Sequence, residues 1–554
     1  MVIHFDVVSP FVPFIALMAS PLLGILLATI FAQAARMPAS LRSLAWLPAA
    51  VGAGVALIAA WLLRGLPDWE AIVGDWSPVS FTGLPLAIAG FAPSAGILIA
   101  WATLYFLDSL RLLVVSPSER HLTASAFIIA SLALVAFANN LVTLLIGLGL
   151  TDLLTAYLAL QRREGERDAL IRLVLNGFSI ALLTLVVAMH AAGGNSLHFP
   201  LVRLDSSTAP ALALAIALRL NLAPFRTSPS VWGDLRTTAG AVGGLLVLVR
   251  LPALGITRLP EWFYMLALVS ALLTLMIAVL RAEEHVDALG PFAVTAGAYL
   301  ASTGAVLAIP GVTSAAAIAW LVGAALIGWP KTGDAPLPIE RARLALRVVG
   351  ALCLVGLPLT VGFVGQAGIL ATWAERGGDG WAFVLGWGVV LAVMTHILLK
   401  ITLGAIGVRA QQTAQTADGA RIGFAWAREA AGGLATLAPI LVFGIAPSLL
   451  TAEAFADVLG RNGLVGWAGW AIAICAGAAL WRLEPRWQPA LHHIRDHAIS
   501  TLDLGWFYSL LGGAVARLRS PFGRVFTLLE SDGALLWAII VVLLIVLIAR
   551  PGGP

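Results

Sequence analysis

Apolar stretches long enough to cross a lipid bilayer recur along the whole chain, separated by short polar or Pro/Gly-rich connections. A helix needs roughly 20 apolar residues to span the hydrocarbon layer, where its backbone must satisfy its own hydrogen bonds. Breaking the apolar runs at charged and Pro/Gly clusters predicts about sixteen transmembrane helices, and therefore an all-α, polytopic membrane protein. The predicted spans are residues 11–33, 44–63, 86–107, 122–138, 141–160, 173–192, 209–224, 239–256, 262–280, 291–309, 314–329, 348–372, 382–407, 431–450, 464–481 and 534–550.

The composition supports this interpretation and excludes other classes of protein. Hydrophobic residues make up 60% of the 554 residues, charged residues only 11%, and the mean hydropathy is +0.95. No polar block is long enough for a soluble catalytic domain. Both cysteines, Cys353 and Cys475, fall inside predicted spans, which argues against disulfides and thiolate metal sites. The formal charge of +4 is small, and Lys331 and Lys400 are the only lysines, so nucleic-acid binding has no support.

Helix breakers interrupt two of the predicted spans, five spans apart. Proline removes a backbone donor and glycine loosens a helix, so unwound backbone can face a polar cavity at such positions. An odd spacing gives opposite orientations, which predicts two inverted repeats, each with one broken helix, as in many ion-coupled transporters. Broken helices also occur without a transport function, and that alternative stays open. The breakers are Pro224 and Pro229 in the seventh span and Pro358, Gly362 and Gly365 in the twelfth.

The repeats suggest a division of the chain. We expect N-terminal transmembrane helices in residues 1–121, the first repeat in 122–256, the second in 257–408, additional helices in 409–481, a cytoplasmic amphipathic segment in 482–533 and a C-terminal transmembrane helix in 534–554.

Arginine is concentrated in connections that follow odd-numbered spans. Cytoplasmic loops are enriched in Lys and Arg close to the spans, so the pattern predicts that both termini lie outside. The first span has no preceding basic residue and no small-residue cleavage site, and we expect it to be retained rather than removed as a signal peptide. The basic residues are Arg36, Arg42, Arg162, Arg163, Arg167, Arg172, Lys331, Arg341, Arg343 and Arg347.

The segment 482–533 is the only long polar connection. Apolar residues recur in it at helical spacing, which predicts an amphipathic helix along the inner surface. His492, His493 and His497 invite a metal hypothesis, but no cysteine lies near them, and interfacial histidines are more often only solvated. We predict no metal site.

Charged residues inside the predicted spans are few. Placing one at the bilayer centre costs at least about 2.5 kcal/mol, so such residues are the strongest functional signal in this sequence. Asp152, Arg219, Arg250 and Lys400 are the clear cases, with His396 one turn before Lys400, and no glutamate falls deep in any predicted span.

Two explanations of these charges remain open. In the structural one, Asp152 pairs with an arginine and Lys400 extends to the inner surface. In the functional one, the five residues lie along a path for protons or cations. Arginine is effectively always protonated and can only bias such a path, whereas lysine and histidine can exchange protons. Asp152 and Arg219 lie at similar depths in spans that run in the same direction, so we expect them to face each other.

Several segments carry a family resemblance. They are residues 74–78 (GDWSP), 139–147 (NNLVTLLIG), 223–226 (APFR), 356–363 (GLPLTVGF) and 529–538 (LESDGALLWA). The chain resembles the antiporter-like membrane subunits of respiratory complex I, Mrp-type cation/proton antiporters, membrane-bound hydrogenases and inorganic-carbon uptake complexes. The resemblance implies a subunit of a hetero-oligomeric complex, possessing both membrane and peripheral partners, in the bacterial inner membrane.

The sequence departs from the family at its charged positions. By the resemblance, Gly149 stands where the family has a glutamate, Asp152 lies one turn later, and Arg219 and Arg250 replace lysines. Gly244 stands in place of a histidine, and the eleventh span holds apolar residues around 319–325 where the family has His and Lys.

Three functions remain open on the sequence alone. The first is translocation of H⁺ or Na⁺ as an antiporter-like module, in a complex that resembles an NADH:quinone oxidoreductase. The second is a non-conducting scaffold that docks redox or carbon-handling partners, and the third is a stand-alone organic-anion transporter. No dinucleotide loop, P-loop or cysteine cluster is present, so no cofactor is predicted.

Overall fold

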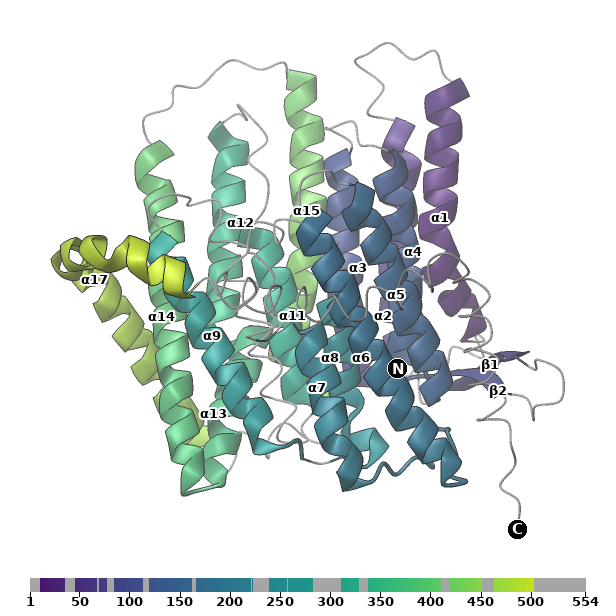
Figure 1. Cartoon of the computed structure of the whole chain (residues 1–554). Coiled ribbons are helices and arrows are strands. Elements are labelled where there is room, and N and C mark those ends of the chain that lie inside the picture. The colour runs from purple at the N-terminus through teal and green to yellow at the C-terminus, as the bar shows by residue number, and fades with distance from the viewer. Residues whose placement is uncertain are drawn as a thin grey trace, which may run out of the picture.

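A computed structural model of the chain describes residues 10–34, 45–66, 69–76, 84–112, 119–161, 166–220, 222, 239–256, 258–281, 310–327, 337–409, 419–450 and 463–502. Its helices stand side by side in a bundle (Figure 1). Eight described helices are long and apolar enough to cross a membrane: 11–33, 47–65, 92–110, 141–158, 173–192, 310–327, 380–400 and 463–489. The all-α polytopic membrane fold is therefore confirmed. The count of about sixteen is not, and the predicted spans 291–309 and 534–550 lie outside the described residues.

The N-terminal part contains α1 (Phe11–Ala34), α2 (Leu47–Gly65), β1 (Glu70–Trp76), β2 (Leu84–Ala89) and α3 (Ala92–Leu112). Helices α1 and α2 pack so closely that a Cβ on Gly52 would lie 2.3 Å from the Ser20 carbonyl oxygen. Only glycine permits this approach. The predicted third span began at residue 86, which is wrong, since residues 84–89 pair with β1 as an antiparallel strand. A short apolar run does not distinguish a buried strand from a helix start.

The middle of the chain forms α4 (Glu119–Phe137), α5 (Leu141–Gln161), α6 (Glu166–Ala192), α7 (Ala209–Arg219) and α8 (Ala239–Arg250). Two 3-10 turns, η2 (Ser206–Thr208) and η5 (Pro252–Leu254), stand before α7 and after α8. The short α7 ends at Arg219, and the predicted breakers Pro224 and Pro229 lie outside the described residues.

The second half contains α9 (Glu261–Arg281), α11 (Pro310–Ile327), α12 (Leu337–Val355), α13 (Val361–Glu375), α14 (Asp379–Arg409), α15 (Gly419–Ile445), the 3-10 turn η7 (Pro447–Leu449) and α17 (Gly463–Leu502). The predicted twelfth span is broken between α12 and α13. Gly356 and Leu359 there adopt positive φ angles of 85° and 73°. This conformation strains any side chain with a Cβ and cannot continue a right-handed helix.

The breakers predicted in this span divide into two groups. Pro358 lies in the break, as expected. Gly362 and Gly365 do not, because both are helical residues of α13. Their small size serves close packing instead: a Cβ on Gly362 would lie 1.6 Å from the Cys353 carbonyl oxygen, and one on Gly365 would lie 2.9 Å from the backbone of Ala316.

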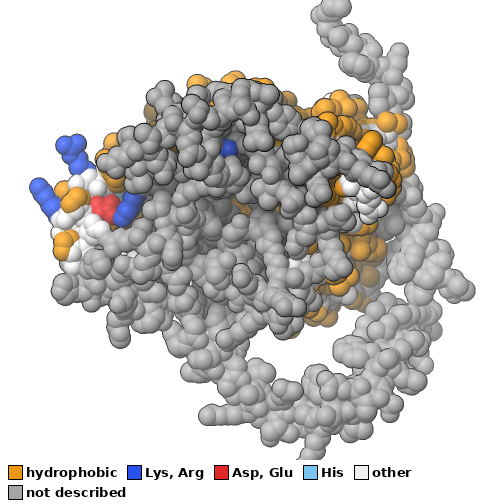
Figure 2. Space-filling view, turned by 90° about the horizontal axis from the view of Figure 1, so that it is seen from above, with side chains coloured by type: hydrophobic (Ala, Val, Ile, Leu, Met, Phe, Trp, Pro, Cys, Tyr) orange, Lys and Arg blue, Asp and Glu red, His pale blue; other side chains and the backbone are white. Residues whose placement is uncertain are grey.

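Helix α17 continues across the predicted boundary at residue 481 and reaches Leu502. Pro485 and Pro489 lie inside it, and each removes one backbone hydrogen bond, which bends a helix. In Figure 1 the last part of α17 turns across the bundle. Seen from above (Figure 2), charged side chains gather on the side where α17 stands, and hydrophobic ones cover described parts of the opposite side.

Candidate functional site

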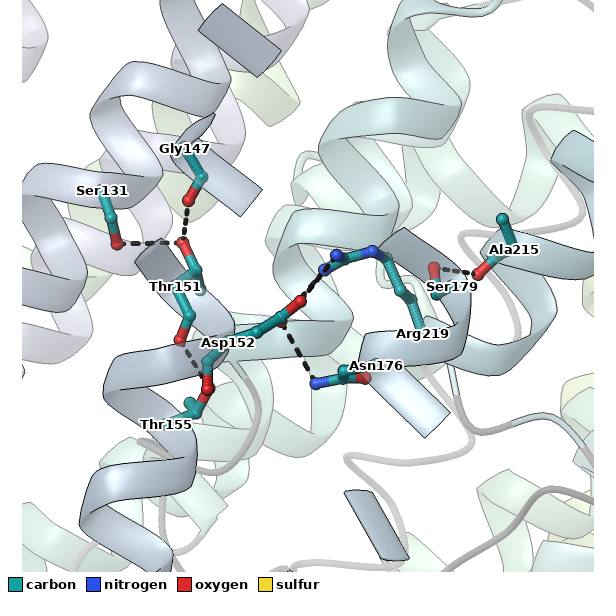
Figure 3. Close-up of polar contacts among 9 residues, drawn as sticks. All are labelled: Ser131, Gly147, Thr151, Asp152, Thr155, Asn176, Ser179, Ala215 and Arg219. Carbon is teal, nitrogen blue, oxygen red and sulfur yellow. Dashed lines mark hydrogen bonds and ion pairs between the residues drawn. The ribbon is translucent and has the colours of Figure 1, made fainter. Parts of the chain in front are cut away.

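Asp152 of α5 and Arg219 of α7 form a bidentate ion pair inside the bundle (Figure 3). Arg219 Nη2 donates to Asp152 Oδ2 at 2.7 Å, and Nη1 donates to Oδ1 at 3.1 Å. Arg219 is 0% exposed and Asp152 is 5% exposed. The predicted meeting of these two residues is confirmed. Two charges this deeply buried are tolerable only because each is the other's partner.

Polar groups of three helices surround the pair. Asn176 of α6 donates through Nδ2 to Asp152 Oδ1 at 3.2 Å. In Figure 3 the amide of Asn176 lies below the guanidinium of Arg219, and both reach the carboxylate from the side away from α5. Directly before Asp152, Thr151 Oγ1 donates to the Gly147 carbonyl and contacts the Ser131 hydroxyl of α4 at 2.9 Å. The carboxylate is thus the centre of a polar layer between α4, α5, α6 and α7.

Glycines of α8 make room for this layer. A Cβ on Gly244 would lie 3.1 Å from Arg219 Cβ, and one on Gly240 would lie 3.0 Å from Asn176 Nδ2. The side chains of Arg219 and Asn176 therefore occupy the volume that larger residues on α8 would fill. The resemblance implies that other family members have a histidine at the position of Gly244. In this chain that histidine would collide with Arg219.

Gly149 lies one turn before Asp152 and is not closely packed against a neighbouring helix. The nearest heavy atom to a Cβ built there is Ile180 Cδ1, at 3.9 Å, which is ordinary van der Waals distance. A Cβ at Gly149, the position that by the resemblance corresponds to the family's glutamate, therefore displaces no backbone.

Arg250, the third predicted path residue, does not join the pair. Its Nη1 donates to the Ala138 carbonyl at 2.5 Å and its Nη2 to the Ala136 carbonyl, at the C-terminal end of α4. The last carbonyls of a helix have no partner within the helix, and a cation there also complements the helix dipole. The rings of Phe91 and Phe199 lie 5.0 and 5.2 Å from the guanidinium carbon. In this structure, Arg250 caps α4.

Lys400 and His396, on α14, meet a residue that the sequence did not suggest. Lys400 Nζ donates to Glu484 Oε1 of α17, and His396 Nε2 lies 3.9 Å from Glu484 Oε2. Glu484 is 9% exposed and lies near the end of the candidate span 463–489, just beyond the predicted span 464–481. The sequence analysis did not count it because charged Arg482 and Pro485 ended the apolar run, whereas the helix itself continues.

The break between α12 and α13 is closed by neutral polar groups. Gln366 of α13 donates through Nε2 to the Leu354 carbonyl at 3.4 Å, and its Oε1 accepts from Trp387 Nε1 at 3.2 Å. Leu354 lies in the last turn of α12, so Gln366 satisfies a carbonyl that the helix end leaves without a partner. The described residues contain no group of three or more His, Cys, Asp or Glu side chains placed to hold a metal ion.

Solved structures of three membrane complexes contain chains with the same fold. A chain of the Mrp complex from Dietzia sp. DQ12-45-1b matches 97% of this chain with a TM-score of 0.64 and 16% identity. A chain of respiratory complex I from Thermus thermophilus matches 79% of it (all of that chain; TM-score 0.58, 19% identity). A chain of the membrane-bound sulfane sulfur reductase, an archaeal respiratory membrane complex, matches 81% of it (78% of that chain; TM-score 0.55, 16% identity).

These likenesses confirm, at the level of the fold, the predicted resemblance to membrane chains of the Mrp complex and respiratory complex I. The chain spans 63% of the length of the Mrp chain that it matches. No family model matches the sequence, and no curated protein does.

Proposed function

We propose that this chain is an ion-translocating membrane subunit of a multi-subunit complex, and that it moves H⁺, with Na⁺ as the alternative ion. The observation that carries the proposal is the buried carboxylate of Asp152, held by Arg219 at the last residue of α7. Chains of the same fold belong to multi-subunit membrane complexes, which supports the presence of partner subunits.

The pair can couple proton binding to movement. While Arg219 is in place, Asp152 stays charged because the guanidinium compensates it. When Arg219 withdraws, a bare carboxylate in an apolar interior takes up a proton instead of remaining charged. Arg219 remains protonated throughout, so it acts as the switch and Asp152 as the proton carrier. The end of α7 at Arg219 gives the side chain a position from which it can move without bending a continuous helix.

We also propose how the chain is oriented in the membrane. The arginine-rich connections face the inside of a bacterial inner membrane, and the N-terminus lies outside. The five predicted path residues then do not act alike: Asp152 and Arg219 form one unit, His396 and Lys400 contribute to a second, and Arg250 stabilises α4.

A scaffold without ion flux is the second candidate, and Arg250 favours it. This arginine replaces a lysine by the family resemblance, yet the two carbonyls of α4 occupy its guanidinium. In the scaffold account, Asp152 and Arg219 only neutralise each other within an old cavity.

Replacing Asp152 by asparagine separates the two accounts. Asparagine keeps the size and can still accept from Arg219, but it cannot carry a proton. We expect the complex to assemble and its proton flux in liposomes, followed by an enclosed pH-sensitive dye, to fall about 10-fold or more, as general acid–base groups contribute about 10²–10⁴-fold elsewhere.

The matched control is Asp205→Asn, because Asp205 lies in the connection before α7 and outside the spans. Hydrogen bonds from Ser207, and then from Ser206, lower the pKa of Asp205 below its usual range. This variant should keep full flux. A fully active, assembled Asp152→Asn complex would remove Asp152 from the mechanism and favour the scaffold.

A further inference from the structure

A second cluster of titratable side chains lies between α14 and α17. Lys400 Nζ donates to Glu484 Oε1, and His396 Nε2 lies 3.9 Å from the other carboxylate oxygen. The side chains of His396, Glu484 and Lys400 are 4%, 12% and 25% exposed. The cluster thus reaches from the packed interior at His396 to partly accessible surface at Lys400, across two helices whose residues are 84 positions apart.

The histidine makes this cluster more than a tether. A lysine and a glutamate suffice to join two helices, whereas burying an imidazole beside them adds a polar group that must be satisfied. The ring of Trp487 lies 5.5 Å from the ring of His396, and among the described residues His396 Nδ1 has no hydrogen-bond partner although it is buried. A neutral imidazole keeps a lone pair on one of its two nitrogens, so the ring can take up a proton.

The charges around the cluster limit how many protons it holds. Helix α12, which packs on α14, contributes the buried cations Arg343 and Arg347, while α17 adds Arg482 and Arg486, both exposed. On α13 and α9 the ionisable residues are Glu375, Glu261, Tyr264 and Arg281. Among the described residues, Glu484 is the anion that approaches both Lys400 and His396. A proton added to His396 would give two cations for one carboxylate, which a weakly solvated site disfavours.

We propose that His396, Glu484 and Lys400 form a proton-exchange site that passes one proton for each proton it takes up. Neutral His396 gains a proton on its ring and becomes a cation. The Glu484 carboxylate then moves from Lys400 to His396. Lys400, having lost its counter-ion, releases one proton from Nζ and becomes a neutral amine. The site begins and ends with one negative and one positive charge, so no net charge is left buried.

This inference rests on the proposed function, because a proton path gives the site its use, and it assigns to Glu484 a role that the sequence did not indicate. Glu484 directly precedes Pro485, one of two prolines inside α17, so movement of the carboxylate acts next to a position where the helix lacks a backbone hydrogen bond.

The titration of His396 tests the site without requiring flux. The purified complex carrying ¹⁵N-labelled histidine is titrated by nuclear magnetic resonance, and the His396 signal is identified by its loss in His396→Gln. An opposite charge at this range shifts a titration by about 1–3 units. We expect Glu484→Gln to lower the midpoint of His396 by about one pH unit or more, and Lys400→Met to raise it. The exposed Glu375→Gln is the matched control and should leave the midpoint unchanged.

Exchanging the charges distinguishes a proton site from a tether. The double variant Lys400→Glu/Glu484→Lys keeps an ion pair between α14 and α17 but turns a cation toward His396. We expect the double variant to assemble, and its proton flux in liposomes to be at least about 10-fold lower than that of the unmodified complex. Full flux in the assembled double variant would overturn the proposal, as would an unchanged His396 midpoint in Glu484→Gln. If the His396 midpoint shifts as expected while Asp152→Asn remains fully active, the exchange site stands and the assignment of the Asp152 path fails.

Discussion

Replacing Arg219 by methionine is expected to destabilise the protein severely. Methionine matches the length of the arginine stem but leaves the Asp152 carboxylate, which is 5% exposed, without its cation. Removing one partner of a buried ion pair costs about 3–5 kcal/mol, because Asp152 must then either take up a proton or remain charged without compensation. The measurement is the midpoint of thermal denaturation of the purified protein in mild detergent, together with the yield of assembled complex.

Two further variants show whether the loss of stability comes from the Asp152 carboxylate left without its partner. Adding Asp152→Asn to Arg219→Met removes that carboxylate and should recover most of the stability. Arg482→Met removes an exposed arginine and should change the midpoint little, since exposed charges contribute less than about 1 kcal/mol. A protein in which Arg219→Met denatures like the unmodified protein would show that the buried pair does not stabilise the bundle.

Replacing Gly362 by alanine is expected to have a comparable effect through packing alone. The added methyl would lie 1.6 Å from the Cys353 carbonyl oxygen and 2.8 Å from its carbon. Both contacts are backbone, so no side-chain rotation can relieve them, and α12 and α13 must separate. Overpacking costs about 1–3 kcal/mol when side chains can shift, and we expect more here. Size-exclusion chromatography and thermal denaturation in detergent measure the outcome.

Gly388→Ala is the matched control for this substitution. Gly388 lies inside α14 and has no heavy atom within 4 Å of an added Cβ. Alanine there should be neutral or stabilising by up to about 1 kcal/mol, because glycine weakens a helix interior. Equal behaviour of the two alanine variants would contradict the close approach of α12 and α13 at the break.

The fold and one ion pair were accessible from the sequence because they depend on depth and periodicity. Apolar runs locate helices, and equal positions along parallel spans placed Asp152 opposite Arg219. The ion-pair partner of Lys400 could not be predicted in this way. Glu484 follows the end of an apolar run, and only the continuation of α17 through Pro485 brings its carboxylate to α14.

The glycines show the same limit. Pro358 and its neighbours predicted a break in the twelfth span, yet sequence alone does not say which glycines unwind and which pack. Gly356 has the positive φ angle, whereas Gly362 and Gly365 are helical and permit close contact. Likewise Gly244 reads as the loss of a titratable residue, and the structure adds the reason: Arg219 fills that space.

A gain of function at Gly149 tests most directly whether a titratable carboxylate on α5 carries the proton. The complex carrying Asp152→Asn is compared with one carrying Asp152→Asn and Gly149→Glu, at equal subunit content, by proton flux in liposomes. The substitution begins without a backbone clash, since a Cβ at Gly149 meets only Ile180 Cδ1 at 3.9 Å. The account predicts that glutamate one turn away restores a large part of the flux that Asp152→Asn removes. An assembled double variant with no more flux than Asp152→Asn alone would contradict it.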